Sequence, residues 1–146
     1  MELLPITEIG PPDRSPSSKD PTIMSLVDAN QAFYRVIGFN PPWIAYLAVE
    51  EGAVVGTCAF KGAPKEGVVE IAYATLTKFE GLGVATRMAQ ELIRAARSMD
   101  PAIRITAQTL PARNASTRVL TKCGFEQVRD VLDDEVGTIW EWELPS

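Results

Sequence analysis

The sequence KFEGLGVAT, at residues 78–86, separates an apolar stretch, VVEIAYATL (residues 68–76), from a stretch with helical spacing, RMAQELIRAARS (residues 87–98). A strand that enters a helix through a glycine-rich turn points backbone N–H groups outward at the positive end of the helix dipole, which attracts anions. Gly81 and Gly83 would let this turn wrap a phosphate without interference from a Cβ atom. The alternative is that the two glycines only make a tight turn, which is the commoner role of a lone G-x-G.

Backbone amides are the expected donors of this candidate anion site. They belong to Gly81, Leu82, Gly83, Val84, Ala85 and Thr86. Two better-known nucleotide-binding motifs do not fit the turn. A P-loop requires Lys followed by Ser or Thr, and a dinucleotide-binding fold requires G-x-G-x-x-G within repeated parallel β-α-β units.

Apolar periodicity predicts the elements on either side of the turn. Helical spacing predicts helices at residues 24–37, 81–97 and 114–123. Alternating or β-rich stretches predict strands at residues 43–49, 53–60, 68–76, 103–109, 125–131 and 136–144. Because a strand, a crossover helix and another strand imply a parallel pair, we expect an α/β (α+β) fold with a mixed, mostly antiparallel central sheet and flanking helices.

Proline and serine dominate the segment before the first predicted helix. Residues 11–22 hold four prolines and three serines, and this composition does not favour regular structure. We therefore expect an N-terminal arm and linker at residues 1–22 and a single domain at residues 23–146. Residues 1–10 form either a tethered edge strand or a loose arm.

The charge balance argues against one class of partner. The chain of 146 residues has a net charge of −5 and a pI near 4.8, whereas nucleic-acid binding needs clustered Lys and Arg. A cationic or amine-bearing partner fits better. The sequence has no apolar stretch of membrane-spanning length and no evident signal peptide, so we expect no membrane partner and a cytoplasmic location.

Rare and missing residue types narrow the chemistry further. The chain has two cysteines, Cys58 and Cys123, and no histidine. The lack of histidine removes His-based metal sites, Ser-His and Cys-His nucleophiles and a histidine general base. We expect both cysteines to be reduced core residues, and no metal cofactor.

Three separated segments together resemble the GNAT superfamily of N-acetyltransferases. They are EIAYATL (residues 70–76), EGLGVA (residues 80–85) and NASTRVLTKCGF (residues 114–125). The resemblance spans residues 44–144 and implies the acetyltransferase fold. In that family the turn follows the pattern Gln/Arg-x-x-Gly-x-Gly/Ala, and its backbone amides hold the pyrophosphate of acetyl-CoA.

The resemblance also implies contacts with the rest of acetyl-CoA. The backbone of Ala74 and Leu76 would pair with the arm of the cofactor as an added strand would, and an amide there could stabilise an oxyanion. Asn114 falls where the family places an Asn that contacts this arm. From the residues alone, Asn114 is also a good helix N-cap, and the two roles are compatible.

Acetyl transfer to an amine needs a base, and Glu70 is the best candidate. It lies in an apolar stretch, which would disfavour its charged form, and the resemblance to the histone-type branch of the superfamily implies a general base at this place. The alternative is an exposed Glu on the wet face of a strand, because a two-fold pattern does not say which face is wet.

Two positions depart from the family pattern. Glu80 stands where the family favours Gln or Arg, and a carboxylate would repel a pyrophosphate, so we expect its side chain to point to solvent. Leu120 stands where many members carry a Tyr that protonates the leaving thiolate. RVLTKCGF (residues 118–125) resembles instead the ribosomal-protein N-terminal acetyltransferase branch, so the proton would come from water, Tyr73 or the attacking amine.

Three functions follow as hypotheses. The first is an N-acetyltransferase that transfers the acetyl group of acetyl-CoA directly to a primary amine of a small molecule or peptide, with Glu70 as its catalytic residue. The second is an acyl-CoA-binding regulatory module without catalytic activity, which Leu120 and Glu80 favour. The third is a structural α/β domain. The Trp-rich last strand could pair with a second copy to form a homodimer.

Overall fold

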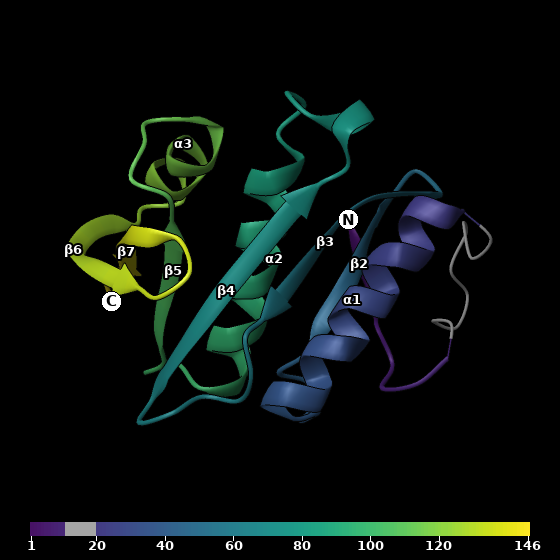
Figure 1. Cartoon of the computed structure of the whole chain (residues 1–146), viewed down its shortest axis with the longest axis horizontal. Helices are drawn as coiled ribbons and strands as arrows, with labels where there is room; N and C mark the ends of the chain where they lie inside the picture. Colours follow the sequence, from purple (N-terminus) through teal and green to yellow (C-terminus); the bar gives the residue numbers. More distant parts are fainter. Residues whose placement is uncertain (11–19) are drawn as a thin grey trace.

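The computed structural model of the chain describes residues 1–10 and 20–146 (Figure 1). The helices are α1 (Pro21–Ile37), α2 (Val84–Met99) and α3 (Ala115–Lys122), with a 3-10 turn (Thr77–Phe79) before α2. The strands are β1 (Glu2–Pro5), β2 (Ala45–Glu50), β3 (Ala53–Phe60), β4 (Val68–Thr75), β5 (Arg104–Thr109), β6 (Glu126–Asp133) and β7 (Gly137–Leu144). Within the described residues they form a seven-stranded sheet in the order β1-β2-β3-β4-β5-β7-β6.

The sheet is mixed, as the sequence predicts. Among the described strands, β4 and β5 run parallel and the other neighbouring pairs are antiparallel. The parallel pair arises because α2 carries the chain from the end of β4 back to the start of β5. The predicted fold class is therefore confirmed.

The start of the chain belongs to this sheet. β1 pairs antiparallel with β2, from Glu2 opposite Val49 to Pro5 opposite Tyr46. Of the two alternatives for the N-terminal residues, the tethered edge strand is the correct one. Most of the predicted Pro/Ser-rich linker, residues 11–19, lies outside the described residues.

The first helix begins earlier than predicted, at Pro21 rather than at residue 24. Asp20 is its N-cap and accepts a hydrogen bond from the backbone N–H of Thr22 (2.8 Å). Pro21 occupies the first helical position, where the missing N–H of proline is no loss. The predicted division of the chain after residue 22 therefore falls inside α1.

The second helix begins later than predicted, at Val84 rather than at Gly81. Gly81 and Gly83 have φ angles of +77° and +78°, which lie in the left-handed region and cannot continue a right-handed helix. The turn therefore stays outside the helix, and its two glycines are required by this backbone conformation.

Helices cover both faces of the sheet. α1 packs on one face through Ile23, Val27 and Tyr34, and α2 packs on the other through residues such as Met88 and Leu92, together with α3. Figure 1 shows α1 in front of the sheet and α2 behind it. Burial of such a side chain contributes about 1.5–3 kcal/mol, so these apolar faces hold the helices in place.

β4 and β5 separate halfway along β4. Their parallel pairing runs from Val68 opposite Arg104 to Ile71 opposite Ala107 and ends there. Beyond this point β4 continues to Thr75 beside β3, while β5 continues beside β7. The two strands therefore form a fork, and the inner edge of β4 presents backbone groups that no strand of residues 1–10 or 20–146 pairs.

Candidate functional site

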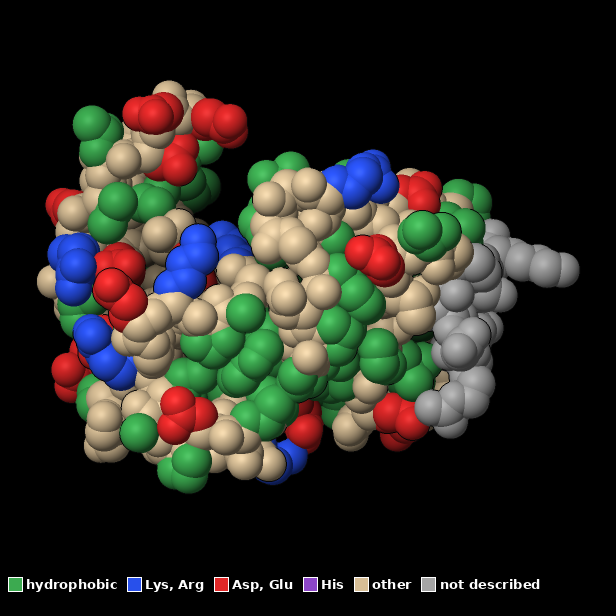
Figure 2. All heavy atoms as spheres, turned by 90° about the horizontal axis from the view of Figure 1, so that it is seen from below, with side chains coloured by type: hydrophobic (Ala, Val, Ile, Leu, Met, Phe, Trp, Pro, Cys, Tyr) green, Lys and Arg blue, Asp and Glu red, His purple; other side chains and the backbone are tan. Residues whose placement is uncertain are grey.

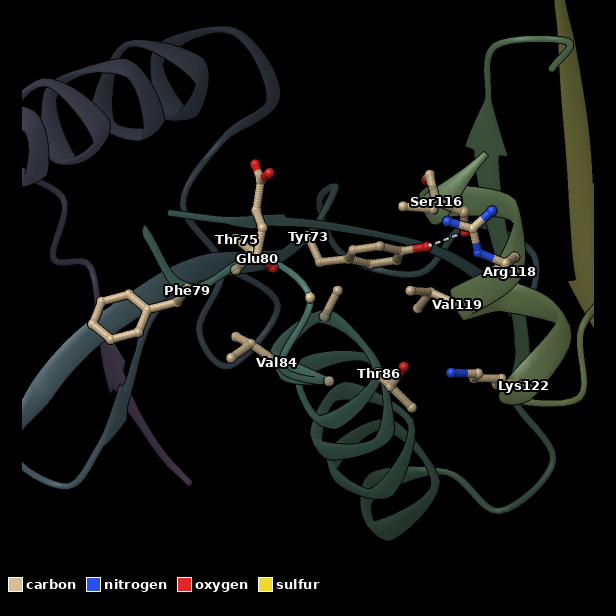
Figure 3. A pocket seen from close by; sticks show the side chains of 14 residues that line it. Tyr73, Thr75, Phe79, Glu80, Val84, Thr86, Ser116, Arg118, Val119 and Lys122 are labelled. Atoms are coloured by element: carbon tan, nitrogen blue, oxygen red, sulfur yellow. Dashed lines mark hydrogen bonds between the residues drawn. The ribbon is translucent and has the colours of Figure 1, made fainter. Parts of the chain in front are cut away.

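A cavity of about 420 Å³ lies at the fork (Figure 3). Its walls are the inner edge of β4, the turn before α2, the first turn of α2 and one face of α3. Five of the predicted anion-site residues line it: Gly81, Gly83, Val84, Ala85 and Thr86. Nine further lining residues were not among the predicted site residues: Tyr73, Thr75, Phe79, Glu80, Ala115, Ser116, Arg118, Val119 and Lys122.

The first turn of α2 presents unsatisfied amides to the cavity. Gly83 is the N-cap and has no side chain that could cap the helix, and the first helical bond runs from the Arg87 N–H to the Gly83 carbonyl (3.1 Å). The amides of Val84, Ala85 and Thr86 therefore have no acceptor within the helix. This is the arrangement that an anion site at a helix N-terminus requires.

An ion pair between β2 and α2 fixes the conformation of the glycine turn. Arg87 donates from Nε and Nη2 to the two carboxylate oxygens of Glu50 (2.7 and 2.8 Å) and from Nη1 to the Leu82 carbonyl (3.0 Å). These hydrogen bonds from Arg87 hold the pKa of Glu50 below its usual value. The Leu82 side chain is 62% exposed and does not line the cavity, so Leu82 contributes its carbonyl to the turn.

The inner edge of β4 is formed by Tyr73 and Thr75, and not by Ala74 and Leu76 as predicted. The Leu76 N–H donates to the Val55 carbonyl of β3 (2.9 Å). Because the backbone groups of a strand alternate between its two sides, those of Ala74 also point to β3. The groups that face the fork therefore belong to Tyr73 and Thr75, both of which line the cavity.

Tyr73 connects β4 to α3 across the cavity (Figure 3). Its hydroxyl donates to the Ser116 carbonyl (3.1 Å). Burial raises the pKa of Tyr73 above its usual value. The phenol is therefore neutral near pH 7 and can act as a donor, as one of the three proposed proton sources requires.

We expect Tyr73→Phe to lower the free energy of unfolding by about 0.5–1.5 kcal/mol, because the partly buried hydrogen bond to the Ser116 carbonyl is lost. Urea denaturation of the wild type and the variant measures this difference. Tyr46→Phe is a suitable control, since the Tyr46 hydroxyl donates to the Pro42 carbonyl at an exposed position. Equal losses in the two variants would contradict a specific connecting role for Tyr73.

Asn114 begins α3 but does not line the cavity. Its side-chain oxygen accepts from the Thr117 N–H (3.2 Å), and the Thr117 hydroxyl accepts from the Asn114 N–H (3.0 Å), which together form a capping box. The next two residues, Ala115 and Ser116, line the cavity instead. The N-cap reading of Asn114 is therefore confirmed, whereas its predicted cofactor contact stays a prediction.

Leu120 belongs to the core between α3 and the sheet. It is fully buried, and its carbonyl accepts from the N–H of Phe125 (2.9 Å), so the chain turns back onto the helix end. Both cysteines are free. Cys58 is buried, which raises its pKa to about 12, and Cys123 is partly buried.

Glu70 lies at the base of the fork, on the face of the sheet opposite to α2. Its neighbours Val69 and Ile71 point into the core under α2, so Glu70 points to the other face. Its Oε2 lies 2.7 Å from Nζ of Lys61 in an ion pair and has no hydrogen-bond partner of good geometry in the described part of the chain. Glu70 does not line the cavity.

A hollow lies on this second face, between the β6–β7 hairpin and the layer of α1 (Figure 2). The tip of the hairpin carries Asp133, Asp134 and Glu135. Backbone hydrogen bonds from Glu135 and Val136 lower the pKa of Asp133, and the charge of Lys61 lowers it further. The tip of the hairpin therefore carries negative charge beside the hollow.

Within residues 1–10 and 20–146, no group of three or more Cys, Asp or Glu side chains is placed to hold a metal ion. In the same part of the chain, no helix combines the length and the apolar character needed to cross a bilayer.

The fork, the cavity and the uncapped helix agree with the acetyltransferase fold that the sequence resemblance implies. The family model described as "Acetyltransferase (GNAT) domain" matches residues 7–126. The chain therefore belongs to the GNAT acetyltransferase family. A comparison with curated proteins gives no match.

Solved structures of acetyltransferases share this fold. An aminoglycoside acetyltransferase in complex with coenzyme A is 19% identical with a TM-score of 0.59, and the match covers 68% of this chain and 64% of that one, just under two thirds of its length. An "IAA acetyltransferase" from Bacillus cereus is 14% identical with a TM-score of 0.63 over 98% and 96% of the two chains. A spermidine N-acetyltransferase chimera from Vibrio cholerae and hSSAT is 9% identical with a TM-score of 0.66 over 81% and 78%.

Proposed function

We propose that the chain is an N-acetyltransferase that transfers the acetyl group of acetyl-CoA directly to a primary amine. The observation that carries this proposal is the cavity at the fork, where the uncapped first turn of α2 meets the unpaired edge of β4. The amides of α2 suit a diphosphate, and the edge of β4 suits an extended arm with amide groups. A structural neighbour in complex with coenzyme A supports this choice of ligand.

The acceptor would approach from the opposite face of the sheet. α2 and α3 cover the cavity side, whereas the second face is hollowed between the hairpin and α1 (Figure 2). Glu70 points to this face at the base of the fork. It would accept the proton of the amine, directly or through a water molecule.

The reaction balances with groups of this chain and the two substrates. The ammonium group of the acceptor first gives a proton to Glu70. The neutral amine nitrogen then forms a bond with the thioester carbonyl carbon, and the C–S bond breaks. The thiolate leaves and takes a proton from water, Tyr73 or the newly bonded nitrogen, which gives up its remaining positive charge as the amide forms. Leu120 offers no proton because it is an aliphatic side chain buried in the core.

The acceptor class rests on charge and on structural neighbours. The net charge of −5 and the acidic tip of the β6–β7 hairpin favour a cationic acceptor. Two structural neighbours are acetyltransferases named for amines, an aminoglycoside and spermidine. We therefore propose a primary amine on a small molecule or peptide.

A second candidate is an acyl-CoA-binding module without catalytic activity. Two observations favour it: Leu120 is buried in place of a hydroxyl acid, and Glu70 is engaged in an ion pair with Lys61. Such a module would bind acyl-CoA at the same site as the proposed N-acetyltransferase but would not transfer the acetyl group.

One experiment separates these functions. Release of free thiol from acetyl-CoA is measured against polyamines, aminoglycosides, amino acids and peptides with free N-termini, and acetyl-CoA binding is measured by calorimetry. Amine-dependent thiol release supports the enzyme, and binding without release against the whole panel supports the binding module. Absence of binding at millimolar acetyl-CoA contradicts both.

We expect Gly83→Ala to weaken acetyl-CoA binding about tenfold. Alanine at a φ of +78° costs about 1–2 kcal/mol, and its Cβ would lie 3.0 Å from Nη1 of Arg87, which holds the Leu82 carbonyl. The turn would then change conformation, and the amides of α2 would no longer converge. Calorimetry gives the dissociation constant of each variant.

Gly67→Ala provides the control for backbone strain. Gly67 has a similar φ of +76°, no atom would lie within 4 Å of its Cβ, and it precedes β4 at the end away from the cavity. Gly67→Ala should lower the free energy of unfolding by about as much as Gly83→Ala does, and its affinity for acetyl-CoA should equal that of the wild type. Unchanged affinity in Gly83→Ala would remove the turn from the binding site.

A further inference from the structure

Two cations on α3 face the first turn of α2 across the cavity. Arg118 and Lys122 are four residues apart, so they lie on the same side of the helix. Both are exposed and both line the cavity. Figure 3 shows the Lys122 side chain extending from α3 towards Thr86 at the start of α2, with Arg118 beside Ser116.

Other basic residues near the turn are already engaged. Arg87 is paired with Glu50 (2.7 Å), and Lys78 lies over the ring of Phe79, 5.1 Å from its centroid. In the part of the chain that the structure describes, neither Arg118 nor Lys122 has a carboxylate within 4.0 Å or a hydrogen-bond acceptor from another side chain. Their charges are therefore available to a ligand.

The cavity is positive although the chain is acidic. Its lining contains one carboxylate, Glu80, which is exposed and comes from the turn on the far side from α3 (Figure 3). Two cations against one carboxylate leave a net positive lining, to which the end of the α2 dipole adds. In a chain with a net charge of −5, this local reversal of sign points to an anionic ligand.

We propose that Arg118 and Lys122 bind phosphate groups of the acyl-CoA and set the preference of the site for the phosphorylated ligand. This inference rests on the proposed function, because it names residues that recognise its co-substrate. The amides of α2 would contact phosphate from one wall and the two cations from the other. The same cations outweigh the repulsion of Glu80, which explains how the turn can tolerate a carboxylate at its start.

Coenzyme A has two kinds of phosphate group that the two cations could bind, the 5′-diphosphate and the 3′-phosphate of the ribose. Titrations of coenzyme A, 3′-dephospho-coenzyme A and pantetheine distinguish them. The proteins are the wild type, Arg118→Ala, Lys122→Ala and the double variant, and each dissociation constant is measured by calorimetry at low and high salt.

We expect roughly a two- to fivefold loss of affinity for coenzyme A in each single variant and about tenfold in the double variant. Affinity for pantetheine should not change, because pantetheine has no phosphate. Added salt should weaken coenzyme A binding more steeply in the wild type than in the double variant. Glu80→Gln should tighten coenzyme A binding severalfold, since it removes the one carboxylate of the lining.

Arg94→Ala is the matched control. It removes the same charge from an exposed arginine of α2 that does not line the cavity, so its affinity for all three ligands should equal that of the wild type. A loss confined to coenzyme A assigns the two cations to the 3′-phosphate, and an equal loss for 3′-dephospho-coenzyme A assigns them to the diphosphate.

Two results would overturn the proposal. The first is unchanged coenzyme A affinity in the double variant, and the second is an equal loss for pantetheine, which would indicate a structural effect on α3. Both differ from failure of the proposed function, in which the wild type itself would not bind coenzyme A.

Discussion

Glu70→Gln is expected to lower the turnover number roughly 10²–10⁴-fold, the usual contribution of a general base. Gln has nearly the same shape as Glu but cannot accept the proton of an ammonium group at neutral pH. The dissociation constant of acetyl-CoA should not change, because Glu70 lies on the opposite face of the sheet and does not line the cavity. Steady-state kinetics with the best amine of the panel and calorimetry with acetyl-CoA measure the two quantities.

Glu143→Gln is a matched control for the loss of a carboxylate on this sheet. Glu143 is ion-paired with Arg104 (2.7 Å), as Glu70 is with Lys61, and the two glutamate side chains are 25% and 24% exposed. The turnover number of Glu143→Gln should stay close to that of the wild type. If Glu70→Gln turns over as fast as the wild type, Glu70 is not the base, and if it loses acetyl-CoA binding, its role is structural.

Gly56→Ala should lower the free energy of unfolding by at least about 1–3 kcal/mol, the range for overpacked cores. A Cβ at this position of β3 would lie 2.5 Å from the Ala74 carbonyl oxygen and 3.0 Å from Cε of Met88. The Met88 side chain can move, but the Ala74 carbonyl is part of the β4 backbone. Urea denaturation measures the loss of stability.

The same substitution should also weaken acetyl-CoA binding. Gly56 pairs with Thr75, which lies on the inner edge of β4 and lines the cavity, so a displaced β4 changes the width of the fork. Calorimetry on the folded variant measures this effect. Wild-type stability together with wild-type affinity would show that the close approach of β3 and β4 is not required.

The order and type of the elements could be predicted from the sequence because local patterns encode them. Alternating apolar residues in β5, helical spacing in α2 and the N-cap Asn114 of α3 each act over a few residues. The start of α2 was predicted three residues early, since helical spacing alone does not show that Gly81 and Gly83 adopt left-handed φ angles.

Local sequence patterns could not predict which residues of β4 form its inner edge. The two-fold pattern of a strand places the backbone N–H and C=O groups of Ala74 and Leu76 on one side and those of Tyr73 and Thr75 on the other. It does not say which pair of residues has its backbone groups towards the fork. The bond from Leu76 to the Val55 carbonyl settles this orientation. It depends on the register between β3 and β4, which is a long-range property of the sheet.

By itself, the sequence determined the mixed α/β fold, the family resemblance and the glycine turn whose amides face the cavity, because each follows from residue types at short spacing. Only the tertiary structure decided what stands opposite that turn. Arg118 and Lys122 follow Gly83 by more than thirty residues and a whole strand, and they reach the cavity because β5 diverges from β4 and carries α3 to its far wall. That position depends on sheet pairing and core packing, which no short stretch of sequence contains.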